Sequence, residues 1–194
     1  MTRVPTTIPP DEAVIPERHP LAPAPGTLIP SHYSHCFGCG ELHPTGLHFT
    51  AIAGEGQSLI GKFVVTENHQ GAPGLAHGGL LSLAFDEALG KLMWLLRAPA
   101  VTARLETDFI APVPIGTQLH INAQITGQAG RKVYSAAVGR IGSPEGPIAV
   151  TASALFIIVP MSHFLENAPK EYLEHIKKNP EILSYLDPEF EINP

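Results

Sequence analysis

Along residues 47–159, hydrophobic and polar positions form six short runs in which apolar and β-branched residues dominate. The runs cover residues 47–53, 58–66, 101–111, 118–126, 132–141 and 148–159. Turns rich in glycine and proline separate most of them: GEG at 54–56, PVPIG at 112–116, GQAG at 127–130 and GSPEGP at 142–147. Because runs of this length and composition, bounded by turn residues, are typical of strands, we predict six β-strands.

The segment 78–96 has a different pattern, because its apolar residues fall on nearly every face of a helix. A helix that is apolar all round is a buried one. Six strands with a single helix exclude a parallel α/β sheet, in which each pair of parallel neighbours needs its own crossover. The pattern therefore predicts an α+β fold, with a mostly antiparallel β-sheet wrapped around one long central helix.

Proline separates the two ends of the chain from this middle part. Eight of the 20 prolines lie in residues 1–30, whereas residues 46–98 contain only Pro73. Since proline donates no backbone hydrogen bond, we expect residues 1–30 to form an extended arm, either disordered or laid along the surface. Pro169, followed by early acids and late lysines, predicts a short C-terminal helix over 168–179. We therefore divide the chain into a Pro-rich N-terminal arm (1–30), one folded domain (31–160) and a C-terminal helical extension (161–194).

Composition and charge exclude several classes of protein. The 194 residues include 12 Lys and Arg against 18 Asp and Glu, a net charge of −6 without the basic patch expected of a nucleic-acid-binding protein. Two cysteines cannot form a disulfide framework, and the N-terminal residues contain no apolar leader. The longest apolar window, 80–96, carries three charged side chains, so we predict no membrane span. These features predict a soluble, cytoplasmic protein.

Two acidic residues interrupt the apolar helix. Glu87 has Lys91 four residues further on, and this favourable surface pair lets Glu87 point outward. Asp86 shares its face with apolar side chains and has no basic partner one turn away. Burying its charge costs several kcal/mol unless another group compensates, so Asp86 is a candidate functional carboxylate. The alternative is a structural hydrogen bond, to Ser82 or to a partner subunit.

The helix begins with His77, Gly78 and Gly79, whose glycines leave backbone N–H groups unshielded. With the helix dipole, these groups form a site for negative charge, including charge that develops on a carbonyl oxygen. The alternative is that the glycines only allow close packing of the loop. Asp86 follows His77 by nine residues, about 13 Å along the helix axis, so the two cannot act on one atom from one helix. A catalytic pair therefore predicts a homodimer, in which antiparallel helices bring Asp86 of one chain to Gly78 of the other.

Three strings of residues resemble the hotdog-fold thioesterases of the PaaI type. They are HQGAPGLAHGGLLSLAFDEALG (69–90), VTARLETDFIAPVPIG (101–116) and GRK (130–132). The resemblance covers about residues 36–160, including the order of the elements. It implies a hotdog fold, in which the sheet wraps the helix and dimers pair their sheets. It also implies an activity, the hydrolysis of acyl-CoA thioesters to free acid and CoA.

The resemblance assigns the catalytic residues by position. Asp86 matches the catalytic acid, which acts as a general base on water or as the nucleophile. Gly78 matches the residue whose amide polarises the thioester carbonyl, with His77 and Gly79 beside it. Thr102 falls where some members carry a Ser or Thr that helps to orient the water. One oriented base and one or two amide donors are sufficient for a thioester, whose carbonyl is already electrophilic.

Four further residues are candidates to bind the substrate. His69 belongs to the matched motif and is a candidate to line the site, with a structural loop histidine as the alternative. One branch of the family has an Asn near the carbonyl of the substrate. This chain has Gly71 there and therefore lacks that side-chain donor. The Pro-Gly pair at 73–74 is closer to the loop of another branch. Arg131 and Lys132 are candidates to bind the phosphates of CoA, with simple solvation of an exposed strand as the alternative.

Cys36 and Cys39, with His32 and His43 nearby, have some likeness to a zinc knuckle. A closed structural zinc site needs four ligands, typically as two pairs separated by a longer loop. All the candidates crowd into residues 32–43, and no second cysteine pair follows. We therefore predict no metal site and interpret CFGCG as a tight glycine turn packed by Phe37. A redox CxxC is not favoured either, because the βαβ context is absent.

These observations predict an acyl-CoA thioesterase that acts as a homodimer or higher homo-oligomer, without a metal or organic cofactor. The main alternative is a hotdog protein that binds acyl-CoA without hydrolysing it, as a sensor or carrier. A dehydratase of hydroxyacyl thioesters is disfavoured, because its usual arrangement of a catalytic His with an acid is not found. An interaction module led by the Pro-rich arm is a further alternative. The absence of a G-x-S-x-G motif disfavours an α/β-hydrolase.

Overall fold

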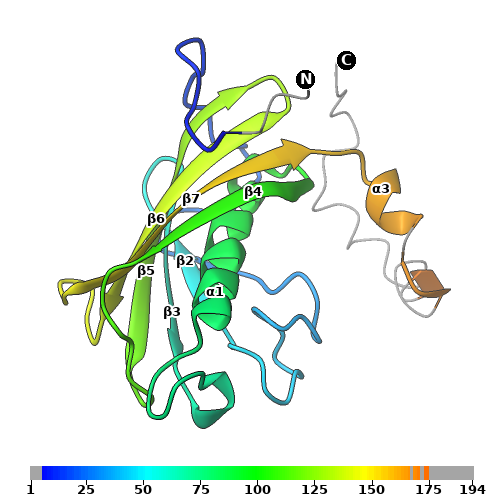
Figure 1. The fold of residues 1–194 in the computed structure, drawn as a ribbon. Coiled ribbons are helices and arrows are strands. Elements are labelled where there is room, and N and C mark those ends of the chain that lie inside the picture. Colours follow the sequence, from blue (N-terminus) through cyan, green and yellow to red (C-terminus); the bar gives the residue numbers. More distant parts are fainter. Residues whose placement is uncertain (1–5, 167, 171–172, 175–194) are drawn as a thin grey trace, which may run out of the picture.

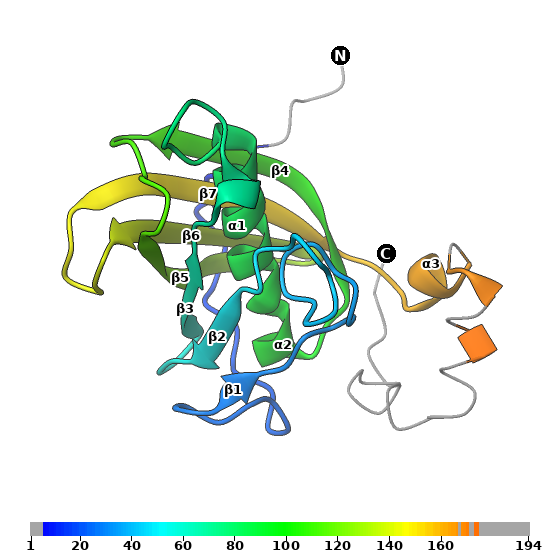
Figure 2. The ribbon, with the colours of Figure 1, turned by 90° about the horizontal axis from the view of Figure 1, so that it is seen from below.

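The computed structural model describes residues 6–166, 168–170 and 173–174, which form one curved antiparallel sheet around a central helix (Figure 1). The strands are β1 (Leu28–Ile29), β2 (Thr50–Ala53), β3 (Ser58–Val64), β4 (Ala100–Phe109), β5 (Gln118–Ala129), β6 (Lys132–Ile141) and β7 (Ile148–Ile158). Their order is β1-β2-β3-β5-β6-β7-β4, and every neighbouring pair is antiparallel. Figure 2, seen from below, shows the sheet curving around the helix. The predicted α+β architecture is confirmed.

All six predicted strands are present, and their ends differ from the predictions by a few residues. The first, predicted over 47–53, begins at Thr50. His48 has a φ of 49°, and this left-handed conformation interrupts the extended backbone before the strand. The N–H of Leu47 donates instead to the carbonyl of Phe37, at 2.8 Å, so this segment pairs with the loop that contains the two cysteines.

The predicted helix 78–96 is present as two consecutive pieces, α1 (Gly78–Lys91) and α2 (Met93–Leu96), with Leu92 between them. It ends at Arg97, whose left-handed conformation (φ 52°) closes the last turn. Burial is less complete than predicted. One side of α1 is fully buried, whereas a stripe on the other side is half-buried or exposed and contains Gly79, Leu83, Asp86 and Gly90.

Close packing between α1 and the sheet depends on a glycine. A Cβ at Gly139 on β6 would lie 2.7 Å from Cζ of Phe85, which is closer than two carbon atoms pack. Phe85 is completely buried in the core. Glycine therefore lets the ring approach β6 and determines how closely α1 lies on the sheet.

The Pro-rich arm lies along the outside of the sheet. Val14 pairs with Gln128 of β5 in an isolated bridge, and β1 adds a short edge strand next to β2. Thr7 accepts a hydrogen bond from Ser153 Oγ (2.9 Å) and donates one to the carboxylate of Glu106. Ser153 lies between buried neighbours on β7, so alternation places it on the outer face. Of the two states predicted for the arm, its described part adopts the surface-bound one.

The predicted C-terminal helix, 168–179, lies mostly outside the described residues. Before it, the chain forms the short helix α3 (Ser162–Leu165), which Figure 1 shows apart from the sheet. None of the helices in the described residues is long and apolar enough to cross a membrane.

Candidate functional site

Asp86 on α1 faces the edge strand β4, where Thr102 Oγ1 donates a hydrogen bond of 2.8 Å to Asp86 Oδ1. An irregularity in the sheet accompanies this contact, because the pairing of β4 with β7 shifts register between Thr102 and Arg104. Bulges of this kind occur next to active sites, where they redirect a side chain. Both Asp86 and Thr102 were predicted from the sequence as site residues, and the structure brings them together.

The surroundings of Asp86 raise the pKa of its carboxyl group. Desolvation by burial is the main cause, and the negative charge of the neighbouring Glu87 adds to it. The hydrogen bond from Thr102 lowers the pKa, because it stabilises the carboxylate. A raised pKa makes the carboxylate a stronger base, and general-base catalysis is most efficient when the pKa of the base approaches the working pH.

The start of α1, eight residues before Asp86, offers one amide without an acceptor in the described residues. His77 is the N-cap residue, and its Nδ1 accepts a hydrogen bond of 2.9 Å from the N–H of Gly79. The N–H of Gly78 has no acceptor among the described residues. The ring of Phe109, at the end of β4, lies 3.4 Å from the position of a Cβ on Gly78. Of the two predicted glycine amides, only that of Gly78 is therefore available to an oxyanion.

Gly71 lies against this helix start. A Cβ at this position would lie 2.8 Å from Cα of His77, which cannot move aside without a shift of the backbone. The loop is held on both sides, since Gly71 N donates to Leu75 O and Ala76 N donates to Val113 O, each at 2.9 Å. A side chain does not fit at position 71, which explains why the side-chain donor of the other family branch is missing here.

His69 is buried behind the helix start. It ends the 3-10 helix η1 (Glu67–His69), and the residue is 2% exposed. Its Nδ1 accepts from the N–H of Thr66 (3.0 Å), and its Nε2 lies 3.3 Å from the carbonyl oxygen of Gly46. Because both ring nitrogens are engaged, the geometry does not support the predicted contact with substrate. The carbonyl of His69 instead accepts the N–H of His77 (2.8 Å) and positions the helix start.

Arg131, in the turn between β5 and β6, and Lys132, the first residue of β6, are both exposed. Lys132 and Val101 both pair with Ile157 of the intervening strand β7, so they lie on one row across the sheet. Two strand spacings of about 4.8 Å separate their backbones by roughly 10 Å. Both predicted phosphate-binding residues therefore lie at the end of the sheet that carries Thr102, away from the helix start.

The two halves of the predicted site are separate within one chain. Asp86 follows Gly78 by eight residues, which is about 12 Å of rise along α1. The strand beside them, β4, is an edge strand that pairs only with β7. Phe109 and Ile110, where β4 ends, are large apolar residues that are 55% and 59% exposed. Within the described residues, the two halves of the predicted site thus stay apart, next to an edge strand and exposed apolar side chains.

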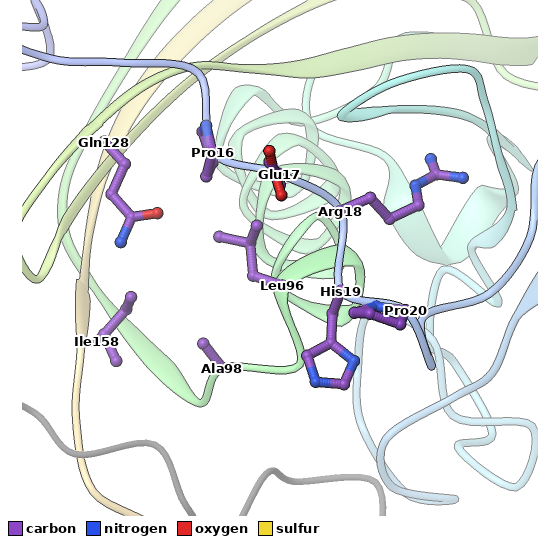
Figure 3. A pocket seen from close by; sticks show the side chains of 9 residues that line it. All are labelled: Pro16, Glu17, Arg18, His19, Pro20, Leu96, Ala98, Gln128 and Ile158. Carbon is purple, nitrogen blue, oxygen red and sulfur yellow. The ribbon is translucent and has the colours of Figure 1, made fainter.

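Two hollows in the described residues lie away from the acid–hydroxyl pair. The first, of about 300 Å³, lies between residues 16–20 of the arm and the end of α2, and Figure 3 shows Leu96 and Ala98 beside the arm. Gln128 and Ile158 line its other side. The second, of about 230 Å³, lies between residues 46–50 and β3. Neither contains Asp86, which is half-buried between α1 and β4.

Glu87 is not on the surface, and the sequence-based prediction for it is wrong. Its side chain is 9% exposed and that of Lys91 is 2% exposed, with 3.7 Å between Glu87 Oε1 and Lys91 Nζ. The loop that contains the two cysteines covers this pair, since Cys36 Sγ lies 3.5 Å from Glu87 Oε2. Helical periodicity did not reveal the burial, because the covering loop comes from a distant part of the sequence.

The family profile of the thioesterase superfamily matches residues 73–147. Acyl-coenzyme A thioesterase THEM4 of Xenopus laevis is 31% identical over 88 residues, which are 45% of this chain and 39% of the relative. The Pseudomonas aeruginosa protein PA0474, which carries the provisional name of an esterase, is 32% identical over 103 residues, 52% of this chain and 75% of the relative. The match thus spans less than half of the vertebrate relative and three quarters of the bacterial one.

Solved structures of other chains share the fold. The PaaI protein from the phenylacetic acid degradation operon of E. coli has a TM-score of 0.54 and 18% identity, over 59% of this chain and 81% of that chain. A hypothetical thioesterase of Streptococcus pneumoniae was solved with alanine in place of an aspartate. It has a TM-score of 0.53 and 15% identity, over 57% of this chain and 90% of that chain. At these identities, the similarity establishes the fold alone.

Proposed function

Since the chain belongs to the thioesterase superfamily and has its hotdog fold, we propose that it hydrolyses acyl-CoA thioesters to a free acid and CoA. The observation that carries this proposal is the hydrogen bond between Thr102 on β4 and Asp86 on α1, in which a hydroxyl orients a carboxyl group of raised pKa. Burying a carboxylate is unfavourable, and such groups cluster at functional sites.

The names of similar proteins support this substrate class. The Xenopus laevis relative is named as an acyl-coenzyme A thioesterase, and the Streptococcus pneumoniae protein has also been solved with coenzyme A. Its two alanine variants replace an aspartate and a threonine 16 positions apart, the same separation as between Asp86 and Thr102. The equal spacing supports Asp86 and Thr102 as a functional pair.

In the proposed reaction, Asp86 takes a proton from a water molecule while the water oxygen attacks the thioester carbonyl. Thr102 holds one carboxylate oxygen and leaves the other for the water. The N–H of Gly78, at the positive end of the helix dipole, stabilises the negative charge that forms on the carbonyl oxygen. When the tetrahedral intermediate collapses, the C–S bond breaks and the proton on Asp86 passes to the CoA thiolate. Direct attack by the carboxylate, through an anhydride, is the alternative.

The proposed site needs two chains. A two-fold dimer that pairs the β4 edges and lays the two α1 helices antiparallel would bring Asp86 of one chain to Gly78 of the other. The half-exposed stripe on α1, the unpaired edge of β4 and the exposed Phe109 and Ile110 support this arrangement, because such a dimer covers all of them. A higher oligomer would keep the same pair of helices.

Arg131 and Lys132 are the proposed contacts for the phosphates of CoA. Both are exposed cations at the end of the sheet that carries Thr102, and charge-assisted hydrogen bonds to phosphate are among the stronger ones in proteins. A cytoplasmic location is part of the same proposal.

Binding of acyl-CoA without hydrolysis is the second candidate function. Two observations favour it: position 71 has no room for a side-chain donor, and His77 occupies the amide of Gly79. The helix start then offers only the amide of Gly78 to stabilise the negative charge on the carbonyl oxygen of the substrate.

The test is the release of CoA thiol from short-chain, long-chain and aryl acyl-CoAs. We expect turnover by the wild type and a loss of about 10²–10⁴-fold in kcat for Asp86→Asn, the usual contribution of general-base catalysis. Asp108→Asn, at an exposed position of β4, is the matched control and should keep its activity. Size-exclusion chromatography should show the same assembly for all three proteins.

Full activity of a folded and assembled Asp86→Asn protein would refute the catalytic assignment. Absence of turnover on every acyl-CoA, together with thermal stabilisation by the same compounds, would establish the second candidate function.

A further inference from the structure

Four side chains with metal-binding atoms meet between the loop before β2 and helix α1. This loop–helix cluster consists of His32, Cys36, Cys39 and Glu87, and its ligand atoms all lie within 4.8 Å of one another. Cys39 Sγ lies 3.3 Å from His32 Nδ1, and Cys36 Sγ lies 3.5 Å from Glu87 Oε2. The prediction of no metal site rested on the crowding of the candidates into residues 32–43 and on the absence of a second cysteine pair, whereas α1 brings Glu87 to the cysteines from outside that segment.

The separations in the cluster suit tetrahedral coordination. Zinc bonds to sulfur are about 2.3 Å long, and those to nitrogen or oxygen are about 2.0–2.1 Å. At tetrahedral angles, these lengths place the donor atoms about 3.3–3.8 Å apart. The separations of 3.3 Å between Cys39 Sγ and His32 Nδ1 and of 3.5 Å between Cys36 Sγ and Glu87 Oε2 agree with that range, and all four ligand atoms lie within 4.8 Å of one another.

The glycines of the CFGCG loop allow the cysteines to approach α1. A Cβ at Gly38 would overlap the carboxylate of Glu87, and a Cβ at Gly40 would lie 2.5 Å from the backbone N of Cys36. The N–H of Gly38 also donates to Cys36 Sγ, at 3.3 Å. Hydrogen bonds from outside the ligand set orient metal ligands in this way.

The charges around Glu87 favour a cation. Its Oε1 is buried and accepts no hydrogen bond from the described residues, although Lys91 lies 3.7 Å away. Lys91 gives its hydrogen bond to the carbonyl of Pro30, at 2.9 Å. Two thiolates and the Glu87 carboxylate carry three negative charges, which one divalent cation and the Lys91 ammonium would balance.

We propose that the loop–helix cluster binds one Zn²⁺ ion in a structural site. Thiolate and imidazole ligands select zinc over Mg²⁺ and Ca²⁺, which prefer oxygen. Four protein ligands leave no open position for a reacting water, so the ion holds structure and does not take part in catalysis. It joins the loop to α1 at the residue next to Asp86 and so stabilises the helix that carries the proposed base.

Metal analysis of the full-length protein tests the proposal. Protein expressed with added zinc and purified in a reducing buffer without chelator should contain about one Zn²⁺ per chain. Cys36→Ser and His32→Ala should lose most of the zinc. His35→Ala, at an exposed histidine of the same loop outside the cluster, is the matched control and should retain it. Substitution with Co²⁺ should give the visible absorption of a tetrahedral ion together with a thiolate-to-cobalt charge-transfer band.

Chelation provides a second readout. It should lower the unfolding temperature of the wild type and of His35→Ala, leave Cys36→Ser unchanged, and make both thiols of the wild type reactive. If Cys36→Ser does not fold, the cobalt spectrum and the thiol protection of the wild type decide alone. Zinc far below one equivalent with freely reactive thiols, or a cobalt spectrum without the thiolate band, would overturn the proposal. None of these measurements depends on acyl-CoA turnover.

Discussion

Asp86 is subject to opposing influences at the residue scale. Burial and the charge of Glu87 raise the pKa of its carboxyl group, whereas the hydrogen bond from Thr102 lowers it. Thr102 therefore has two effects, because it orients the carboxylate and also keeps enough of it ionised to act as a base. The pH dependence of both activity and stability should report on this balance.

Thr102→Val should shift the acidic limb of the pH–rate profile to higher pH. The substitution removes a hydrogen bond to the carboxylate, so the pKa of Asp86 rises further and a higher pH is needed to ionise it. The pH dependence of kcat/KM measures this shift. Thr107→Val, on the same strand, is the control and should leave the acidic limb of the profile in place. An unshifted acidic limb in Thr102→Val would contradict the proposed role of Thr102 in controlling the pKa of Asp86.

Asp86→Asn should be more stable than the wild type at neutral pH. Because burial raises the pKa of Asp86 above its ordinary value of about 3.9, the folded chain holds this proton at pH values where the unfolded chain has lost it. The wild type therefore loses stability as the pH rises through that window, and Asn removes the loss. The difference should disappear as the pH falls below the ordinary pKa.

Urea unfolding at several pH values and one protein concentration measures this difference. Asp108→Asn, at an exposed carboxylate, should show no comparable dependence. A lower stability of Asp86→Asn at neutral pH would show that burial is not what controls this carboxyl group.

At the scale of elements, the positions of α1 and β4 create the site. The register shift in β4 occurs where Thr102 meets Asp86, and the end of the same strand brings Phe109 to the start of the helix. Phe109 was not predicted as a site residue, since an apolar residue in a strand gives no local signal of such a contact. The depth at which α1 packs depends on Gly139 of β6.

Gly139→Ala should destabilise the protein by about 1–3 kcal/mol, the usual effect of overpacking a core. The new Cβ would lie 2.7 Å from Cζ of Phe85, a ring that is completely buried. In a Phe85→Leu background the added penalty should be smaller, because the ring atom that causes the overlap is gone. Denaturant unfolding of the four proteins in this double-mutant cycle measures the coupling, and equal penalties in both backgrounds would exclude the contact as the cause.

For the whole molecule, the proposed catalytic groups lie apart on one helix, Gly78 as its first residue and Asp86 further along it. About 12 Å of helix separates Asp86 from Gly78, and neither hollow in the described residues contains the acid. The outer edge of β4 and the stripe on α1 are the surfaces on which a second copy would complete the site. In the proposed dimer, activity is a property of the pair of chains, and complementation tests this.

Asp86→Asn and Gly78→Pro should each be inactive alone and partly active when co-expressed as a mixed dimer. Proline suits the first helical position and removes only the N–H, and His77 before it is already extended. One intact site of two in each heterodimer predicts about half of wild-type activity for the purified heterodimer, and about a quarter for an unsorted, randomly paired mixture. Thiol release by the doubly tagged, co-purified dimer measures it.

Gly78→Ala keeps the amide and meets Phe109 only at ordinary contact distance, so it is the matched control for Gly78→Pro and should retain most of the activity. Mixed dimers without any activity would place the whole site within one chain.

Much of the fold could be predicted because its signals are local. Strand and helix periods and turn residues lie within a few consecutive positions, so the six long strands and the central helix were recognised with small errors at their ends. The short strand β1 was missed, since its two residues lie in a Pro-rich segment without a strand pattern. Asp86 was also visible, because a carboxylate stands out in an apolar helix whatever surrounds it.

The sequence by itself thus determined the elements, their order and the acid that the proposed mechanism uses. Only the tertiary structure decided that Thr102 binds Asp86, that His77 occupies one of the two glycine amides, and that Glu87 is buried against two cysteines. The physical reason is the same in each case. These contacts depend on how closely folded segments approach one another, and that distance follows from packing and backbone irregularities that no local pattern of residues records.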